Sequence, residues 1–356
     1  MNIVVVFGGK SVEHEISIIS ACQVMEAMKI KYNVIPVYIS KKNKFYYDKR
    51  MDDISYFKSA KNKTKKRNEI KFKNKNGKYY VIGKKKMRFD LVFPIVHGKG
   101  SEDGTILNYF RFKGIPVVGN SASFYSIAQD KALTKRVLDG MSISNVKYKL
   151  IKRWDDYSRG DFTFPCIVKP NNLGSSLGIS VARNYIELEK AIAYCFKVDS
   201  EVLVEDYLQD CKEYNISVLN DNGEIKTSDI DEVIKGEIFT YKEKYLDGNK
   251  KNGLASKTHT RRNTVGKVIQ KQIETIAKDV YKTFNASGVI RIDFLYKDKL
   301  YLNEINSIPG SYAYYLWENK YDFLELIDIS IKEARRNNYF MNKDNELIVK
   351  NVIFPL

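Results

Sequence analysis

The segment Gly288-Val-Ile-Arg291-Ile-Asp293-Phe-Leu-Tyr-Lys-Asp-Lys-Leu-Tyr-Leu-Asn-Glu304-Ile-Asn306-Ser-Ile-Pro-Gly310 predicts a β-hairpin. Residues 289–296 and 300–305 are rich in β-branched and aromatic side chains, and the polar residues 297–299 form a short turn between them. Side chains alternate along a strand, so Arg291 and Asp293 share one face, as do Glu304 and Asn306. If the chain turns at Asp298, the two faces coincide.

This hairpin face would bring together two carboxylates, one amide oxygen and one guanidinium. Oxygen ligands suit Mg²⁺, which proteins usually hold with one or two carboxylates and substrate phosphates. Arg291 would be a fixed cation beside the metal, suited to a phosphate or a developing oxyanion. Spacing alone is equally compatible with a solvated charged face. The turn that ends at Gly310 favours a binding site, because it can bring backbone N–H groups close to a ligand.

Length and composition predict a globular protein of two or three domains. The chain has 356 residues, 44% of them hydrophobic, and no apolar run approaches the ~18 residues that a membrane span requires. Four scattered cysteines without a Cys-x-x-Cys motif, together with three histidines, argue against zinc. The first residues lead directly into a predicted strand without a secretion signal, so we expect a cytoplasmic protein with reduced thiols.

The net charge of +17 is concentrated in one segment. Residues 41–88 hold 19 Lys and Arg against 4 Asp and Glu, whereas the rest of the chain is near neutral. Charge runs are usually solvated faces, so we interpret the segment as a solvated insertion, and shortening residues 58–78 should leave the activity within a few-fold. The alternative is a polyanion-binding patch; nucleic acid is not the expected partner, and no membrane partner is expected.

Strands and helices alternate in the first part of the chain. Residues 3–7 and 34–39 read as strands on either side of a helix, which predicts a βαβ unit in a parallel sheet. A further strand from residue 91 leads into the glycine-rich loop from His97 to Glu102. Glu13 could therefore contact a ligand at the carboxyl edge of the sheet, although such a residue is more often an ordinary part of a first helical turn. His97 opens a glycine-rich loop that carries Glu102, and a functional and a structural role are equally expected for it.

The second half of the chain contains two loops that suggest ligand binding. A strand that ends at Lys169 precedes the Gly/Ser loop at 171–178, which can cover phosphates but lacks the Walker pattern. The polar loop at 239–262 is long enough to be functional or disordered. Apolar residues at helical spacing predict helices at 121–138, 185–196, 265–284 and 321–335.

Taken in order, the motifs resemble the D-alanine–D-alanine ligase family of the ATP-grasp superfamily. The matching pieces are Gly8-Gly-Lys-Ser-Val-Glu13, His97-Gly-Lys-Gly-Ser-Glu102, Asp130-Lys131, Val168-Lys169-Pro, Gly174-Ser-Ser-Leu-Gly178, Val204-Glu205-Asp-Tyr207, Lys244-Tyr245, Arg291-Ile-Asp293 and Asn303-Glu304-Ile-Asn306. The resemblance implies an α/β ATP-grasp fold with an N-terminal Rossmann-like parallel-sheet domain at 1–122. It further implies a central subdomain at 123–213, and a C-terminal subdomain at 214–356 with a closing loop at 239–262 and a metal-binding hairpin at 288–310.

The resemblance also implies an activity: ATP phosphorylates the carboxylate of one D-amino acid, and the amine of a second attacks the acyl phosphate. The resemblance implies that the phosphates are bound by Lys131, Lys169, Lys244 and Ser176, the adenine by Glu205 and Tyr207, and the ribose by Glu213. It implies that Mg²⁺ or Mn²⁺, with two ions expected, is bound by Asp293, Glu304 and Asn306. It also implies that the oxyanion is bound by Arg291 and the Gly310 N–H, that the first substrate's ammonium is bound by Glu13, and that the reacting groups are oriented by Ser175 and Tyr245. We add His97, Glu102, Tyr315 and Leu316 as substrate contacts. D-alanine is the expected substrate, and the product would be used for peptidoglycan precursors. Because members of this family are often dimeric, a homodimer is possible.

Two positions depart from the family pattern and bear on the second substrate. Tyr315 stands where the family usually has Ser before the Leu that matches Leu316, and Leu254-Ala-Ser stands where Pro-Ala is usual. The alternatives are therefore a ligase that takes D-Ser, D-lactate or another amino acid in second place. A more distant alternative is a non-catalytic, basic polyanion-binding protein on the same scaffold.

Overall fold

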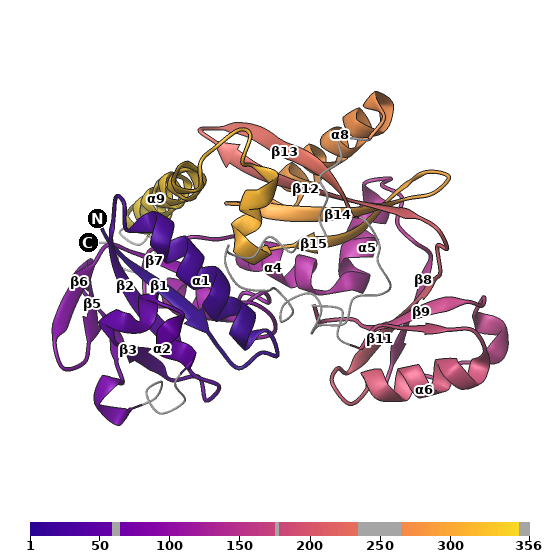
Figure 1. The fold of residues 1–356 in the computed structure, drawn as a ribbon, viewed down its shortest axis with the longest axis horizontal. Coiled ribbons are helices and arrows are strands. Elements are labelled where there is room, and N and C mark those ends of the chain that lie inside the picture. The colour runs from indigo at the N-terminus through magenta and orange to yellow at the C-terminus, as the bar shows by residue number, and fades with distance from the viewer. Residues whose placement is uncertain (59–64, 175–177, 234–264, 349–356) are drawn as a thin grey trace.

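The computed structural model describes residues 1–58, 65–174, 178–233 and 265–348 (Figure 1). The described residues form four sheets, with strand orders β3-β2-β1-β7, β4-β5-β6, β10-β9-β11-β8 and β13-β12-β14-β15. Within this part of the chain, no helix is both long and apolar enough to cross a membrane.

The N-terminal sheet contains the predicted βαβ unit. Its strands are β1 (Asn2–Gly8), β2 (Asn33–Ile39), β3 (Phe45–Tyr47) and β7 (Leu91–Ile95), and β1 pairs in parallel with both β2 and β7. Helix α1 (His14–Met28) connects β1 to β2, and α3 (Thr105–Phe112) follows the loop after β7. Gly8 has φ +98°, and a Cβ there would lie 2.4 Å from the Ile39 carbonyl oxygen, so the turn after β1 requires glycine.

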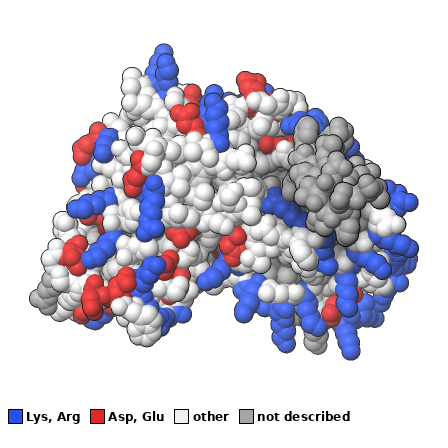
Figure 2. Space-filling view, turned by 180° about the vertical axis from the view of Figure 1, so that it is seen from behind, with Lys and Arg blue, Asp and Glu red and all other residues white. Residues whose placement is uncertain are grey.

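Outside residues 59–64 the basic segment is folded, and its interpretation as a solvated insertion is wrong for its apolar side chains. It forms β4 (Lys71–Lys75), β5 (Lys78–Ile82), β6 (Lys86–Phe89), α2 (Ser55–Lys58) and 3₁₀ turns at Lys49–Asp52 and Lys66–Asn68. Phe72, Val81 and Phe89 are buried in the same hydrophobic cluster as β1 and β2. The alternating lysines of β4 are exposed, and Figure 2 shows Lys and Arg side chains gathered over one end of the molecule. Only the charged face of this segment is solvated.

We expect the charged and apolar positions of β4 to respond differently to substitution. Changing Lys71, Lys73, Lys75 and Lys78 to Gln should alter the free energy of unfolding by no more than about 0.5 kcal/mol per site, because they are exposed. Phe72→Ala should cost about 3–5 kcal/mol, because it empties a buried position. Denaturant unfolding of both variants tests this; equal stabilities would contradict the burial of β4 against the N-terminal core.

The central sheet consists of β8 (Tyr148–Lys152), β9 (Cys166–Pro170), β10 (Ser180–Ala182) and β11 (Glu201–Asp206), all antiparallel to their neighbours. Helix α6 (Tyr185–Cys195) packs against it through a small apolar core (Figure 1). The single helix predicted at 121–138 is wrong. Asp130 is extended and separates α4 (Ala122–Gln129) from α5 (Lys131–Gly140), because its side chain accepts the Leu133 N–H and caps α5.

The C-terminal sheet consists of β12 (Lys212–Asp221), β13 (Glu224–Val233), β14 (Ile290–Tyr296) and β15 (Leu300–Asn306), and α8 (Lys267–Thr283) packs on it. A 3₁₀ segment, Gly310–Leu316, and α9 (Phe323–Ile348) then return to the N-terminal part, where both contact α1. Leu316 and Trp317 are buried in the second hydrophobic cluster, which also contains residues of β1. This shared cluster holds the hairpin at a defined place relative to the N-terminal sheet.

Candidate active site

The predicted hairpin is present, and its polar side chains share one face. In β14 and β15, Asp293 pairs with Glu304 and Arg291 pairs with Asn306, with a bulge between Asp293 and Phe294. Directly opposed residues of antiparallel strands point to the same side of the sheet. The coincidence of the two faces, which spacing left open, is therefore confirmed.

Arg291 and Asp293 form a two-point ion pair. The Arg291 Nε and Nη2 donate to the two carboxylate oxygens at 2.8 and 2.9 Å, and Asn306 Nδ2 donates to Asp293 Oδ2 at 3.0 Å. The third nitrogen, Nη1, lies 3.5 Å from the Tyr315 hydroxyl. Asp293 is 5% exposed, and a buried carboxylate that lost its paired cation would be strongly destabilising. The pair orients the guanidinium, and Asn306 keeps its amide oxygen for another partner.

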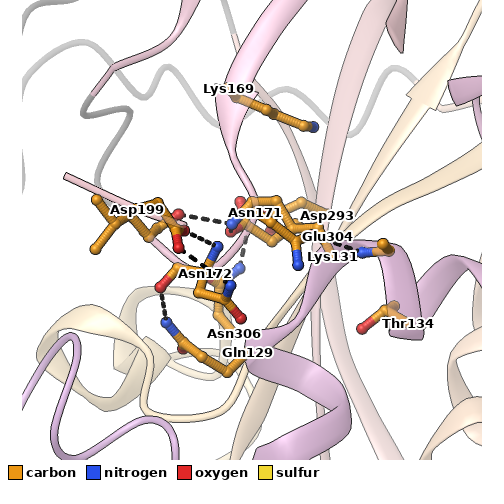
Figure 3. Close-up of polar contacts among 12 residues, drawn as sticks. Gln129, Lys131, Thr134, Lys169, Asn171, Asn172, Asp199, Asp293, Glu304 and Asn306 are labelled. Carbon is orange, nitrogen blue, oxygen red and sulfur yellow. Dashed lines mark hydrogen bonds and ion pairs between the residues drawn. The ribbon is translucent and has the colours of Figure 1, made fainter. Parts of the chain in front are cut away.

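Lys131 connects α5 to the hairpin. Its Nζ lies 3.4 Å from Glu304 Oε1 and donates to the Leu173 carbonyl at 2.6 Å, so it lies between the C-terminal sheet and the loop after β9 (Figure 3). Burial by itself raises the pKa of the Glu304 carboxyl. The positive charges of Lys131, Lys169 and Arg291 outweigh burial and lower that pKa. Glu304 is thus held ionised, as a metal ligand must be.

The donor set fits a hard divalent cation. Asp293 and Glu304 are opposed carboxylates, and Asn306 adds an amide oxygen on the same face. Among the described residues, no three His, Cys, Asp or Glu side chains cluster as a complete metal cage. Two carboxylates completed by phosphate oxygens are the usual arrangement for Mg²⁺, which makes a binding site for a metal–phosphate complex the better fit.

Lys169 forms a second buried ion pair, with Glu205. Its Nζ lies 2.7 Å from Glu205 Oε2, and Lys135, from α5, lies 3.0 Å from Oε1. All three side chains are less than 9% exposed. Burial raises the pKa of Glu205, but the two ammonium groups outweigh burial and lower it. A buried carboxylate between two cations is therefore kept charged beside Lys169.

Asn171 ties the end of β9 to the start of α5. Its Nδ2 donates to Asp130 Oδ1 at 2.9 Å and to Glu201 Oε2 at 3.0 Å, and its Oδ1 accepts the Ala132 N–H at 2.9 Å. The side chain is fully buried. Around it, Gln129, Asn172 and Asp199 continue the polar network (Figure 3). This network places Lys131 and Lys169, which come from different elements, on one side of the hairpin.

The predicted substrate residues of the N-terminal part also come together. His97 Nδ1 lies 3.5 Å from Glu102 Oε1, and a Cβ at Gly98 would lie 2.5 Å from Glu13 Oε2. Gly98, at φ +80°, therefore lets the loop after β7 approach Glu13. A Cβ at Gly174 would lie 3.6 Å from Glu13 Oε1 and 4.0 Å from Glu102 Oε2. The loop after β9 thus meets the carboxyl edge of the N-terminal sheet.

A cavity of about 730 Å³ lies beside this cluster. It is lined by Glu13, Ser11, Val96, Leu173 and Gly174, among others, and so lies between the N-terminal and central parts. Arg291, Asp293 and Glu304 are not among its lining residues. The cavity is therefore large enough for a small amino acid next to Glu13 but does not itself contain the hairpin cluster.

The other predicted residues are more dispersed. Tyr207 is 37% exposed after β11, Glu213 is half-buried in β12, and Gly310 begins the 3₁₀ segment that ends at Leu316. Leu316 points into the core, so only its backbone is available to a ligand. The predictions for Ser175, Ser176, Lys244, Tyr245, Leu254 and the loop 239–262 lie outside the described residues.

Sequence reasoning missed Lys135 and Asn171. Lys135 could have been found from its spacing, because it lies four residues after Lys131 and so on the same helical face. No local pattern distinguishes Asn171 from other loop asparagines. Its importance comes from contacts with residues 30 to 41 positions away in the sequence.

The arrangement defines the class of protein. Lys131 from α5 contacts a carboxylate on the C-terminal antiparallel sheet, next to an N-terminal sheet with parallel strands, and this is the organisation of an ATP-grasp enzyme. Two family models match, "D-ala D-ala ligase N-terminus" at residues 2–120 and "D-ala D-ala ligase C-terminus" at 138–328. The chain belongs to the D-alanine–D-alanine ligase family, whose members are ATP-dependent ligases.

Individual relatives agree with this assignment. The chain is 36% identical to the D-alanine–D-alanine ligase of Thermosipho melanesiensis over 337 residues, which cover 92% of each chain. The crystal structure of the Helicobacter pylori D-alanine–D-alanine ligase matches with 30% identity and a TM-score of 0.73, over 93% of this chain and 98% of that one. A D-Ala:D-Ser ligase from Enterococcus faecalis matches with 28% identity and a TM-score of 0.77, over 94% and 98%.

Proposed function

We propose that this protein joins two molecules of D-alanine at the expense of ATP, through an acyl phosphate, and so supplies the dipeptide for peptidoglycan precursors. The contact between Lys131 and Glu304 carries the proposal, because an ammonium group next to a carboxylate is what a bound metal–phosphate complex would require. The relatives named above support D-alanine as the substrate. The domain boundaries at 122 and 213 remain a prediction.

Phosphoryl transfer requires charge neutralisation and positioning more than covalent chemistry from the protein. Lys131 and Lys169 would bind the phosphates, and Glu205, Tyr207 and Glu213 would bind the nucleoside. Asp293, Glu304 and Asn306 would hold Mg²⁺ or Mn²⁺, with two ions expected, which neutralise phosphate charge when bound. The predicted phosphate contacts Ser176 and Lys244 belong to the same proposal.

The amino acids would lie between the hairpin and the N-terminal cluster. Glu13 would pair with the ammonium of the first D-alanine, with His97 and Glu102 beside it. Arg291 and the Gly310 N–H would donate to the oxyanion that forms when the second amine attacks the acyl phosphate. Ser175 and Tyr245 would orient the reacting groups, and closure of the 239–262 loop would exclude water from the acyl phosphate.

The decisive experiment is ADP release across a panel of D-Ala, D-Ser, D-lactate and L-Ala, with each product identified by mass. We expect ADP release with D-Ala alone and a product with the mass of D-Ala–D-Ala. The same reaction without Mg²⁺ or Mn²⁺ should give no product. Absence of ADP release with every substrate, together with salt-dependent RNA binding, would instead favour the non-catalytic polyanion-binding alternative.

Tyr315 is expected to act on the second substrate. Its hydroxyl lies beside Arg291, and burial raises its pKa, so it is a neutral hydrogen-bonding group at neutral pH. Tyr315→Ser should change the KM for the second D-alanine, or the preference between D-Ala and D-Ser, by roughly tenfold, and leave the first site's KM unchanged. Tyr315→Phe, which removes only the hydroxyl, separates loss of a hydrogen bond from added space. Unchanged kinetics in both variants would show that Tyr315 does not line the pocket.

We also propose that the enzyme works in the cytoplasm, where ATP is available, and that it forms a homodimer, as members of this family often do. Fractionation of cells and light scattering of the purified protein test these two points independently of activity.

A further inference from the structure

Helix α5 carries two lysines that reach different parts of the molecule. Lys131 lies next to Glu304 of the C-terminal sheet, and Lys135, one turn later, lies next to Glu205 of the central sheet. Lys135 is 1% exposed, and a buried ammonium is costly unless it is paired. Lys135 is not one of the lysines expected to bind phosphate, so its burial needs another explanation.

Three partners surround the Lys135 ammonium. It lies 3.0 Å from Glu205 Oε1, donates to the Val146 carbonyl at 3.0 Å, and lies 5.3 Å from the centre of the Tyr148 ring. The ammonium has three N–H donors and a fixed set of partners, so it is held in one position. A cation held in this way attracts the Glu205 oxygen that it contacts, through an ion pair.

Glu205 in turn has a lysine at each oxygen. Lys169 lies 2.7 Å from Oε2, and Lys135 takes the other side. Lys169 is expected to bind phosphate. This requires that Glu205 does not neutralise the positive charge of Lys169 completely. Lys135 and Lys169 together neutralise Glu205, so these three groups carry a net positive charge. Lys169 therefore keeps N–H donors that can bind a nucleotide.

We propose that Lys135 is a positioning residue for the nucleotide, which acts through Glu205. It holds the Glu205 carboxylate ionised and oriented for the base, and it leaves Lys169 free to bind phosphate. The proposal rests on the proposed function only in that the site binds a nucleotide.

Replacing Lys135 should make nucleotide binding depend on pH, with weaker binding at acidic pH. The charged groups facing Glu205 are Lys135 from α5 and Lys169 from β9, and both lower the pKa of its carboxyl. Tyr148 on β8 and Asp139 on α5 act on Lys135 rather than on Glu205. Removing Lys135 removes one cause of the lowering, so the pKa of Glu205 rises. Glu205 is then protonated at a higher pH, and nucleotide binding weakens first at acidic pH.

The test is titration calorimetry of Mg·ADP binding to the full-length protein from pH 5.5 to 8.5. We expect Lys135→Met to weaken Mg·ADP binding more at pH 6 than at pH 8, because one of the two cations that lower the pKa of Glu205 is removed and the ionised fraction of Glu205 falls on the acidic side. Lys135→Arg, which keeps the charge, should restore most of the affinity at pH 6. Arg136→Met changes an exposed neighbour on the same helix and should match wild type throughout.

A double-variant comparison separates this role from a purely structural one. If Lys135 acts through the charge of Glu205, then the single variant Glu205→Gln and the double variant Lys135→Met/Glu205→Gln should bind Mg·ADP with equal affinity. The ratio of their affinities should also stay the same at every pH. This pair also serves if Lys135→Met alone does not fold, because the double variant also removes the buried carboxylate charge that Lys135 neutralises. A further loss of affinity in the double variant, or equal weakening of Lys135→Met at both pH values, would overturn the proposal.

The binding assay keeps the two hypotheses apart. A wild-type protein that binds Mg·ADP but does not form the dipeptide would contradict the proposed function and leave the Lys135 proposal standing. A wild-type protein that binds no nucleotide would overturn both.

Discussion

Asp293→Asn and Glu304→Gln are each expected to lower kcat by roughly 10²–10³-fold while the protein stays folded. The two carboxylates are opposed on the hairpin and would hold the divalent cation that stabilises charge in phosphoryl transfer. Such stabilisation is worth several kcal/mol in the transition state, which corresponds to a loss of about this size. Interactions made mainly in the transition state affect kcat more than substrate affinity, so the KM for ATP should change far less.

The measurement is steady-state ADP release at saturating D-alanine over a range of Mg²⁺ concentrations. Both variants should require more Mg²⁺ for half-maximal rate, because one of two charged ligands is lost. Asp298→Asn is the matched control, since Asp298 is exposed in the turn of the same hairpin. A near-normal kcat at saturating Mg²⁺ in either variant would exclude that carboxylate as a metal ligand.

Arg291→Lys should lower kcat by roughly 100-fold, the usual effect of removing one oxyanion donor. Lysine keeps the positive charge but offers a single ammonium, which cannot reproduce the two-point contact with Asp293 and still direct a donor toward the substrate. A loss of activity in this variant therefore reports the geometry of the guanidinium rather than its charge.

Arg291→Met should, in addition, reduce the free energy of unfolding by about 3 kcal/mol, because Asp293 is buried and loses its cation. The double variant Arg291→Met/Asp293→Asn should recover much of that stability without recovering activity. Denaturant unfolding and kcat measured on the same samples test both statements, with Arg183→Lys as an exposed control. Full activity in Arg291→Lys would mean that the oxyanion is bound by other groups.

Local patterns in the sequence were sufficient to predict the hairpin and the parallel βαβ unit. A two-residue alternation that ends in a polar turn determines which side chains share a face, and β14 and β15 form the expected pair. The helix at 185–196 was predicted to within one residue, because one apolar side contacts the sheet along its whole length. In each of these cases the determining interactions lie within the segment or its nearest neighbour.

Two predictions failed where a local signal competed with another interaction. The helix expected at 121–138 is interrupted at Asp130, whose side chain caps the following helix more favourably than it continues the preceding one. The lysines of residues 41–88 suggested a solvated insertion, but Phe72 and Phe89 join the N-terminal core. Charge density describes only the exposed face of a strand and is uninformative about the other face.

Residue types and their order along the chain were enough to predict the family, the hairpin and most residues of the candidate site. Which of those residues meet depends on the packing of distant elements. Lys135 and Glu205 are 70 positions apart in the chain and become partners because α5 lies next to β11. Asn171 connects β9 to α5 for the same reason. Residue type and spacing specify local geometry, whereas the burial and charge state of Glu205 and Lys135 depend on packing between elements that no local pattern contains.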